Sequence, residues 1–209
     1  ASEQDLEIVG GEVLVKGAPD MKMGLGRVAN TVAGTPGYAL PGEVEPGMEA
    51  TEYFVVDDMA YASGTAVAEV EVDVETGGVK ILRYVLAHDC GTILHPVIVD
   101  GQIHGGTAHG IGNALYEWMG FDENGQPITT NLGEYLLVTA TEMPPVEIIH
   151  HESPSPLNPL GVKGVGECGV VPAPAAIMSA IEDALTPFGV RVTRTPLFPA
   201  EIVALINKQ

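Results

Sequence analysis

The stretch that decides the fold is residues 68–90, AEVEVDVETGGVKILRYVLAHDC. In its first half valines alternate with acidic residues, the period of two that a strand with one buried face requires. Residues 75–78, ETGG, predict a turn, and residues 79–90 predict the returning strand. The alternation of that second strand loses phase between Ile81 and Leu82, which indicates either a β-bulge or burial on both faces. The stretch therefore predicts two antiparallel strands whose valines face a core and whose acidic side chains face solvent.

Elements on either side of this hairpin complete the pattern. Residues 6–15, LEIVGGEVLV, predict a second hairpin with Gly10 and Gly11 as its two-residue turn. Apolar residues at helical spacing occur in three further stretches, 97–118, 172–185 and 199–207. Strands and helices that do not alternate regularly favour an α+β fold with mixed or antiparallel sheets and packed helices. We expect residues 1–50 to form the N-terminal hairpin, a short helix and a Gly/Pro-rich loop, and residues 51–209 to form a C-terminal domain.

The composition excludes several classes of function. The chain of 209 residues holds 28 acidic and 9 basic side chains, so its formal net charge is −19. A chain this acidic is repelled by a phosphate backbone and by an anionic membrane surface. No apolar run reaches the roughly 20 residues of a membrane span. Two cysteines are too few for a disulfide framework, which favours a reducing, cytoplasmic location. We therefore expect no nucleic-acid partner and no membrane partner.

Residues 164–169, GVGECG, have the G-x-G-x-x-G spelling of a dinucleotide-binding loop without its context. The preceding residues 152–163, ESPSPLNPLGVK, are too rich in proline to form the central strand that such a loop follows. The glycines instead let a backbone approach a bulky group, and they present one carboxylate, Glu167. Two interpretations stay open: Glu167 caps the helix that starts near Pro172, or its carboxylate takes part in chemistry.

Residues 101–112, GQIHGGTAHGIG, form the second unusual segment. Their glycines recur four residues apart, so one side of the predicted helix has almost no side chains. Each glycine costs a helix about 1 kcal/mol relative to alanine, so the pattern indicates that another body comes very close. That body is either a packed neighbour inside the core or a flat, bulky cofactor held by Gln102 and by exposed backbone amides.

A zinc site is the alternative for residues 88–95, HDCGTILH. His88, Cys90 and His95 are only three local ligands, and the chain has no C-x-x-C pair to supply a fourth. Residues 150–152, HHE, are a weaker candidate because adjacent residues of a strand point to opposite faces. We expect histidines that are hydrogen-bonded within the fold rather than a zinc site.

Together these segments resemble the molybdenum-binding large subunit of the xanthine dehydrogenase, aldehyde oxidoreductase and carbon monoxide dehydrogenase family, of which the chain resembles only the C-terminal portion. The resemblance is most specific in residues 99–117, VDGQIHGGTAHGIGNALYE, and in residues 163–185, KGVGECGVVPAPAAIMSAIEDAL. His95 and His109 stand where the family commonly has Asn and Gln. The resemblance implies that residues 51–209 are the C-terminal part of a molybdopterin-binding domain.

The resemblance also implies a set of site residues. Glu167 falls in the family's GxGE loop and is implied to be the base beside molybdenum. Gln102 falls in the family's GQxxGG helix and is implied to approach the pterin. The other cofactor-binding residues implied are Gly105, Gly106, Lys163, Gly164, Val165 and Gly166. No side chain is implied to ligate molybdenum directly, because the pterin holds it.

The implied function is that of a molybdenum hydroxylase, which oxidises an aldehyde, an N-heterocycle or carbon monoxide with water as the oxygen source. The cofactor is molybdenum–molybdopterin, expected in a dinucleotide form. Iron–sulfur clusters and FAD are expected on partner chains, because two cysteines cannot ligate a cluster that needs four. The expected partners are the upstream part of the molybdenum subunit, the iron–sulfur and flavin subunits, and a small-molecule substrate.

The family's subunit is far longer than this chain, so we expect either a subunit split between two polypeptides or an excised or cleaved fragment. The competing function is a non-catalytic acidic scaffold or partner-binding domain that has kept the fold. An intact GVGE at residues 164–167 argues against this alternative, because a chain without catalysis has no need to retain the carboxylate.

Overall fold

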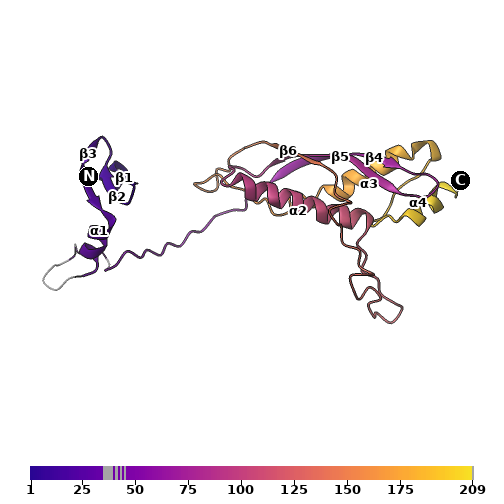
Figure 1. The fold of residues 1–209 in the computed structure, drawn as a ribbon, viewed down its shortest axis with the longest axis horizontal. Coiled ribbons are helices and arrows are strands. Elements are labelled where there is room, and N and C mark those ends of the chain that lie inside the picture. Colours follow the sequence, from indigo (N-terminus) through magenta and orange to yellow (C-terminus); the bar gives the residue numbers. More distant parts are fainter. Residues whose placement is uncertain (35–39, 41, 43, 45, 209) are drawn as a thin grey trace. The chain divides into compact units, whose positions relative to one another are not determined.

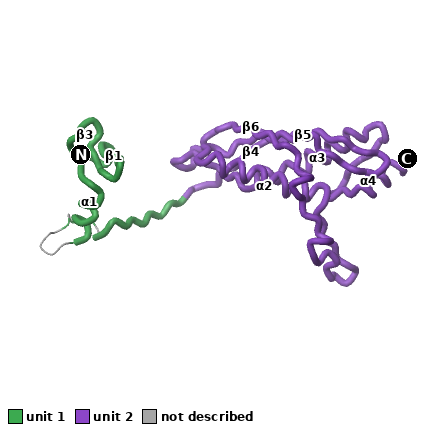
Figure 2. Tube along the Cα trace, viewed as in Figure 1, with its two compact units in different colours: residues 1–55 green, residues 56–209 purple. Residues whose placement is uncertain are grey.

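The computed structural model describes residues 1–34, 40, 42, 44 and 46–208, and it divides into two compact units, Ala1–Val55 and Val56–Gln209 (Figures 1 and 2). Residues 35–39, 41, 43 and 45 of the expected Gly/Pro-rich loop lie outside the described residues. In the described part of the chain, no helix combines the length and the apolar character needed to cross a membrane.

The first unit is a small antiparallel sheet followed by a short helix. Its elements are a 3₁₀ turn, three strands in the order β1-β2-β3, and one helix: η1 Glu3–Asp5, β1 Leu6–Val9, β2 Glu12–Val15, β3 Ala18–Gly24 and α1 Leu25–Val32. Gly10 and Gly11 have φ of +58° and +83°, the left-handed conformation that a two-residue hairpin turn needs, so the predicted hairpin is confirmed. The strand β3 was not predicted, because Pro19 and Asp20 disfavour strands, and both are tolerated here at the edge of the sheet.

The second unit contains a mixed sheet of three strands in the order β4-β5-β6: β4 Ser63–Val72, β5 Val79–Asp89 and β6 Val146–His150. The pairing of β4 with β5 is antiparallel, as residues 68–90 predict. Its register passes from Glu69 opposite Arg83 to Val70 opposite Ile81, so Leu82 is the extra residue of a bulge. The loss of phase in the sequence therefore marks a bulge and not burial on both faces, since the Leu82 side chain is exposed.

Helices cover one face of this sheet (Figure 1). They are α2 Pro96–Leu115, α3 Ala173–Ala184 and α4 Pro199–Ile206, with a 3₁₀ turn η2 at Thr186–Phe188. The buried side chains of β5, Tyr84 and Leu86, form one core cluster with Ile103 of α2 and Ala173 of α3. The acidic residues of β4 are exposed while the alternate residues are partly buried. The α+β fold and the mixed sheet are thus confirmed.

The strand β6 joins this sheet from a distant part of the sequence. It pairs in parallel with β5, and the register places His150 opposite His88. The sequence did not indicate β6, because the strand has only 5 residues and directly follows Pro144 and Pro145. Its position brings residues from three separate elements to one end of the sheet.

Candidate cofactor and active site

The GVGE loop precedes α3, and the residues that join the loop to α3 pack along the glycine-rich side of α2. A Cβ atom added at Gly106 would lie 3.0 Å from the Cα atom of Gly169, and one added at Gly110 would overlap the Ala173 side chain. The first approach is tighter than most Cβ contacts and the second is an overlap, so a larger residue at either position would force its neighbours to move. For Gly106 and Gly110 the packing interpretation of the helix is therefore correct.

A second set of glycines has free space where a side chain would lie. A Cβ atom added at Gly101, Gly105 or Gly164 would meet nothing within 4 Å. At Gly166 the nearest atom is Oε1 of Gln102, at 3.7 Å from the added Cβ. The side chain of Gln102 is exposed and lies beside the loop. Backbone of α2 at Gly101 and Gly105 and backbone of the loop at Gly164 is thus accessible to a flat group.

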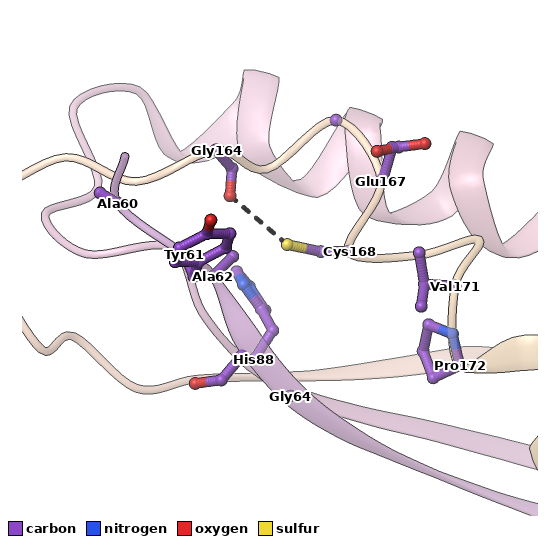
Figure 3. Close-up of a pocket in the computed structure, with 12 residues that line it drawn as sticks. Ala60, Tyr61, Ala62, Gly64, His88, Gly164, Glu167, Cys168, Val171 and Pro172 are labelled. Atoms are coloured by element: carbon purple, nitrogen blue, oxygen red, sulfur yellow. Dashed lines mark hydrogen bonds between the residues drawn. The ribbon is translucent and has the colours of Figure 1, made fainter. Parts of the chain in front are cut away.

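Glu167 lies on a pocket of about 610 Å³ between this loop and the start of β4 (Figure 3). The pocket is lined by Ala60, Tyr61, Ala62, Ser63, Gly64, His88, Gly164, Gly166, Glu167, Cys168, Val171 and Pro172. Helix α3 has Pro172 as its N-cap and no side-chain hydrogen bond at that cap, so the capping interpretation of Glu167 is wrong. The side chain of Glu167 is exposed, and none of the hydrogen bonds or ion pairs of the described residues engages its carboxylate.

Lys163 and Val165 anchor the beginning of the loop. The Nζ atom of Lys163 donates to Oδ2 of Asp89 at 2.8 Å, and both side chains are largely buried. The second carboxylate oxygen of Asp89 accepts from the backbone N–H groups of Gly91 and Ser153. The ammonium of Lys163, helped by these N–H groups, lowers the pKa of Asp89 to about 2. Val165 packs against the core cluster of β5 and α2, so the loop is held at a fixed position relative to both elements.

The histidines predicted to be ordinary hydrogen-bonded residues have partners. The Nε2 atom of His88 lies 2.8 Å from Nδ1 of His150, and Nδ1 of His95 accepts from the Ile98 N–H at the start of α2. The described residues contain no group of three or more ligands arranged to hold a metal ion. Cys90 is buried, and its burial raises the pKa of the thiol. The contact of His150 with His88 was missed because no pattern in the local sequence predicted that this segment pairs with β5.

The site therefore combines an α+β framework, an open glycine surface, one exposed amide and one unengaged carboxylate on a pocket. That combination has the features that a cofactor-binding domain needs. The chain belongs to the molybdopterin cofactor-binding domain family, whose model matches residues 1–144.

Similar proteins agree with this membership. The chain is 40% identical over 203 residues to the 6-hydroxypseudooxynicotine dehydrogenase complex subunit gamma of Paenarthrobacter nicotinovorans, a match of 97% of this chain and 25% of that protein. It is 38% identical over 150 residues to the carbon monoxide dehydrogenase large chain of Hydrogenophaga pseudoflava, a match of 72% of this chain and 19% of that protein.

A solved structure extends the agreement to the whole fold. Quinoline 2-oxidoreductase from Pseudomonas putida 86 matches with a TM-score of 0.89 at 36% identity, covering 100% of this chain and 26% of that chain. The resemblance to molybdenum-binding large subunits is confirmed. The chain spans about a quarter of the length of the subunit gamma from Paenarthrobacter nicotinovorans and of quinoline 2-oxidoreductase.

Proposed function

We propose that this chain forms one side of the active site of a molybdenum hydroxylase and supplies its base, Glu167. The observation that carries the proposal is the free carboxylate of Glu167 on a pocket whose neighbouring backbone is open. A carboxylate that caps no helix and pairs with no cation has no evident structural task, so it is available to accept a proton.

The residues fit a bound molybdopterin. The amide of Gln102 can both donate and accept toward the edge of a pterin, and its Oε1 atom already lies beside Gly166. Gly105 and Gly164 leave their backbone uncovered, which a flat ring system needs for close approach. Gly106, Lys163 and Val165 hold this surface in place by packing and by the ion pair with Asp89.

When bound, the cofactor supplies the redox chemistry by accepting two electrons from the substrate and passing them to partner centres. Glu167 accepts a proton at a carboxylate oxygen from the water that becomes the nucleophile. The flanking Gly166 has no side chain to come between the carboxylate and that water. A general base of this kind contributes about a hundredfold or more to the rate.

We propose an N-heterocycle as the substrate class, in preference to an aldehyde or carbon monoxide. A pocket of about 610 Å³ is far larger than carbon monoxide requires. Its walls include Ala60, Ala62, Val171 and Pro172, which suit the faces of an aromatic ring. Two similar proteins are named for nicotine and quinoline. The proposed partners are the remainder of the large subunit and subunits that carry iron–sulfur clusters and FAD, because two cysteines cannot ligate a cluster that needs four and the family resemblance implies a flavin subunit.

The test is a comparison of Glu167→Gln with Glu123→Gln in the complex assembled with its partner polypeptides. Glu123 lies in an exposed turn and serves as the matched control. The unsubstituted complex and both variants should contain near-stoichiometric molybdenum. Turnover should fall about a hundredfold or more only in Glu167→Gln, because the amide cannot accept the proton.

Two results would contradict the proposal. Full turnover of Glu167→Gln with metal present would place the base elsewhere. A complex that contains no molybdenum would favour the non-catalytic scaffold instead.

A further inference from the structure

The strand β4 is the edge of its sheet. The order of the strands is β4-β5-β6, so β4 pairs only with β5 along its 10 residues. Among the described residues, no other strand and no backbone hydrogen bond engages the second edge of β4. A strand edge of this length presents a row of unpaired N–H and C=O groups, which can pair with a further strand.

The hairpin shows which residues turn their backbone toward the open edge. The N–H of Asp73 donates to the carbonyl of Gly78, where the turn leaves β4. In an antiparallel pair, alternate residues direct both of their backbone groups at the partner strand. The extra residue of the bulge belongs to β5, so this alternation continues along β4 without a break. The odd-numbered residues therefore face β5, and the even-numbered ones, Ala66 and Ala68 among them, face the open edge.

An open groove of about 540 Å³ lies beside this edge, between β4 and α3. On the β4 side it is lined by residues 64–68. On the α3 side it is lined by Ala175, Ala176, Ser179 and Ala180. Because these side chains are small, they leave space next to the strand edge. An added strand would place alternate side chains in that space, since successive side chains of a strand point to opposite faces.

The outer face of β4 is acidic toward the turn. Glu69 and Glu71 are exposed, and no ion pair of the described residues includes either of them. Arg83 lies opposite Glu69, but its guanidinium is paired with Glu147 of β6 at 2.6 Å. A strand added at this edge is therefore most stable with Lys or Arg beside these two carboxylates, because oppositely charged cross-strand neighbours attract.

A second copy of this chain does not offer that chemistry. Each copy has a formal net charge of −19 and would bring its own Glu69 and Glu71 to a joined sheet. Like charges on neighbouring strands oppose such pairing. The chain spans 25% of the similar subunit gamma from Paenarthrobacter nicotinovorans, so most of a comparable subunit lies outside it. That remaining polypeptide is the better source of the added strand.

The groove is continuous with the pocket of Glu167. Gly64 and Pro172 line both hollows. A segment bound at the edge of β4 would thus lie directly beside that pocket.

We propose that the edge of β4 accepts a β-strand from the remainder of the large subunit, with basic side chains on its outer face and apolar side chains toward α3. The proposal rests on the function proposed above, which takes the remainder of the large subunit as a partner. Backbone hydrogen bonds hold the added strand, and the groove and the acidic side chains select it. The strand attaches the other side of the active site next to Glu167.

Amide hydrogen exchange in the assembled complex, resolved to single residues by mass spectrometry, tests the pairing. The amides of Ala66 and Ala68 face the edge, and those of Thr65 and Val67 face β5 and are the matched internal controls. We expect the two sets to exchange at rates within about tenfold of each other, because all four amides are hydrogen-bonded. Faster exchange of Ala66 and Ala68 than this would show an open edge and overturn the proposal.

A charge reversal tests the chemistry of the added strand. Glu69→Lys should accelerate exchange at Ala68 about threefold or more, because it places a cation beside the basic strand. Exchange at Val67 should stay unchanged, which shows that the pairing with β5 is intact. Glu123→Lys in an exposed turn is the matched control and should leave both amides unchanged. The same rate at Ala68 in Glu69→Lys and in the control would contradict a basic partner strand.

A photo-crosslink identifies the strand. Val67 is 61% exposed on the outer face of β4, so Val67→p-benzoylphenylalanine should crosslink in the complex to a segment of the remaining large subunit that contains Lys or Arg. The same substitution at Glu123 should not label that segment. A crosslink to a second copy of this chain or to an iron–sulfur or flavin subunit overturns the proposal, and so does the absence of a crosslink.

The outcomes separate this proposal from the proposed function. If the unsubstituted complex has no molybdenum-dependent turnover, the hydroxylase function fails, while exchange and crosslinking still decide whether a strand is added at β4. An open edge in a complex that turns over overturns the added strand alone.

Discussion

The two pairs of glycines on α2 have the same spacing but opposite surroundings. Gly106 and Gly110 face Gly169 and Ala173 so closely that a Cβ atom does not fit, whereas Gly101 and Gly105 face open space. The first pair fixes the GVGE loop against the helix. The second pair leaves backbone uncovered for a ligand. One glycine-rich sequence thus serves packing at one pair of glycines and leaves the other pair open, where we propose that the cofactor binds, and local sequence alone does not separate the two.

The largest effect is expected at the packed pair. Gly110→Val places branched methyl groups against Ala173 and the Val170 carbonyl, so the loop must move away from α2. We expect a loss of about 3 kcal/mol in the free energy of unfolding, measured by urea denaturation. The same change at Gly101 should cost less than about 1 kcal/mol. Equal losses at both positions would remove the distinction between the pairs.

The position of the loop also depends on the ion pair between Lys163 and Asp89. Asp89→Asn should lower the free energy of unfolding by about 3 kcal/mol at pH 7, because the ammonium stays largely buried without its counterion. The folded-state pKa of Asp89, about 2, lies below its ordinary value of 3.8, so the pair stabilises the fold above pH 4 and is lost as the pH falls toward 2. Urea titrations across this range should converge for the two proteins at low pH. A constant difference would assign the effect of Asp89→Asn to packing.

The role of the open pair, Gly101 and Gly105, can be tested by measuring how much cofactor the complex binds. Gly105→Leu adds a side chain where the structure has free space, so the fold should retain its stability within about 1 kcal/mol. If a pterin lies over this backbone, molybdenum content of the assembled complex should fall about tenfold, as determined by metal analysis. Normal molybdenum content would show that the ligand does not use this surface.

The smallest effect is expected at Gly101. Gly101→Ala should raise the free energy of unfolding by up to about 1 kcal/mol, because alanine favours the helix and meets no neighbour. A thermal melt of the purified chain would detect an upward shift of a few degrees. A downward shift would mean that Gly101 is packed after all.

Local patterns predicted the elements that depend on neighbours in sequence. The alternation at residues 68–74 predicted β4, and the phase change at Leu82 marked the bulge, since both are set by which side chains face the core. The GVGE loop and the glycine-rich helix could be read as special segments because glycine is costly in helices.

Features that depend on distant partners were not predictable in this way. The strand β6 is short and follows two prolines, and only its pairing with β5 stabilises it. Without β6 no pattern in the sequence joins His88 with His150, which are 62 residues apart. The ion pair of Lys163 with Asp89 is a contact of the same long-range kind.

The parallel pairing of β6 also determines the order in which the site can assemble. A tight turn joins β4 to β5, so that hairpin closes with little loss of chain entropy. The strand β6 must close a loop that includes all of α2 before it can add its hydrogen bonds, which makes its docking a late event in folding. We therefore expect β6 to join the sheet only after the β4–β5 hairpin has formed. A chain caught before that step would leave β5 as an edge strand with unpaired backbone groups, which is an exposed site for pairing with another chain.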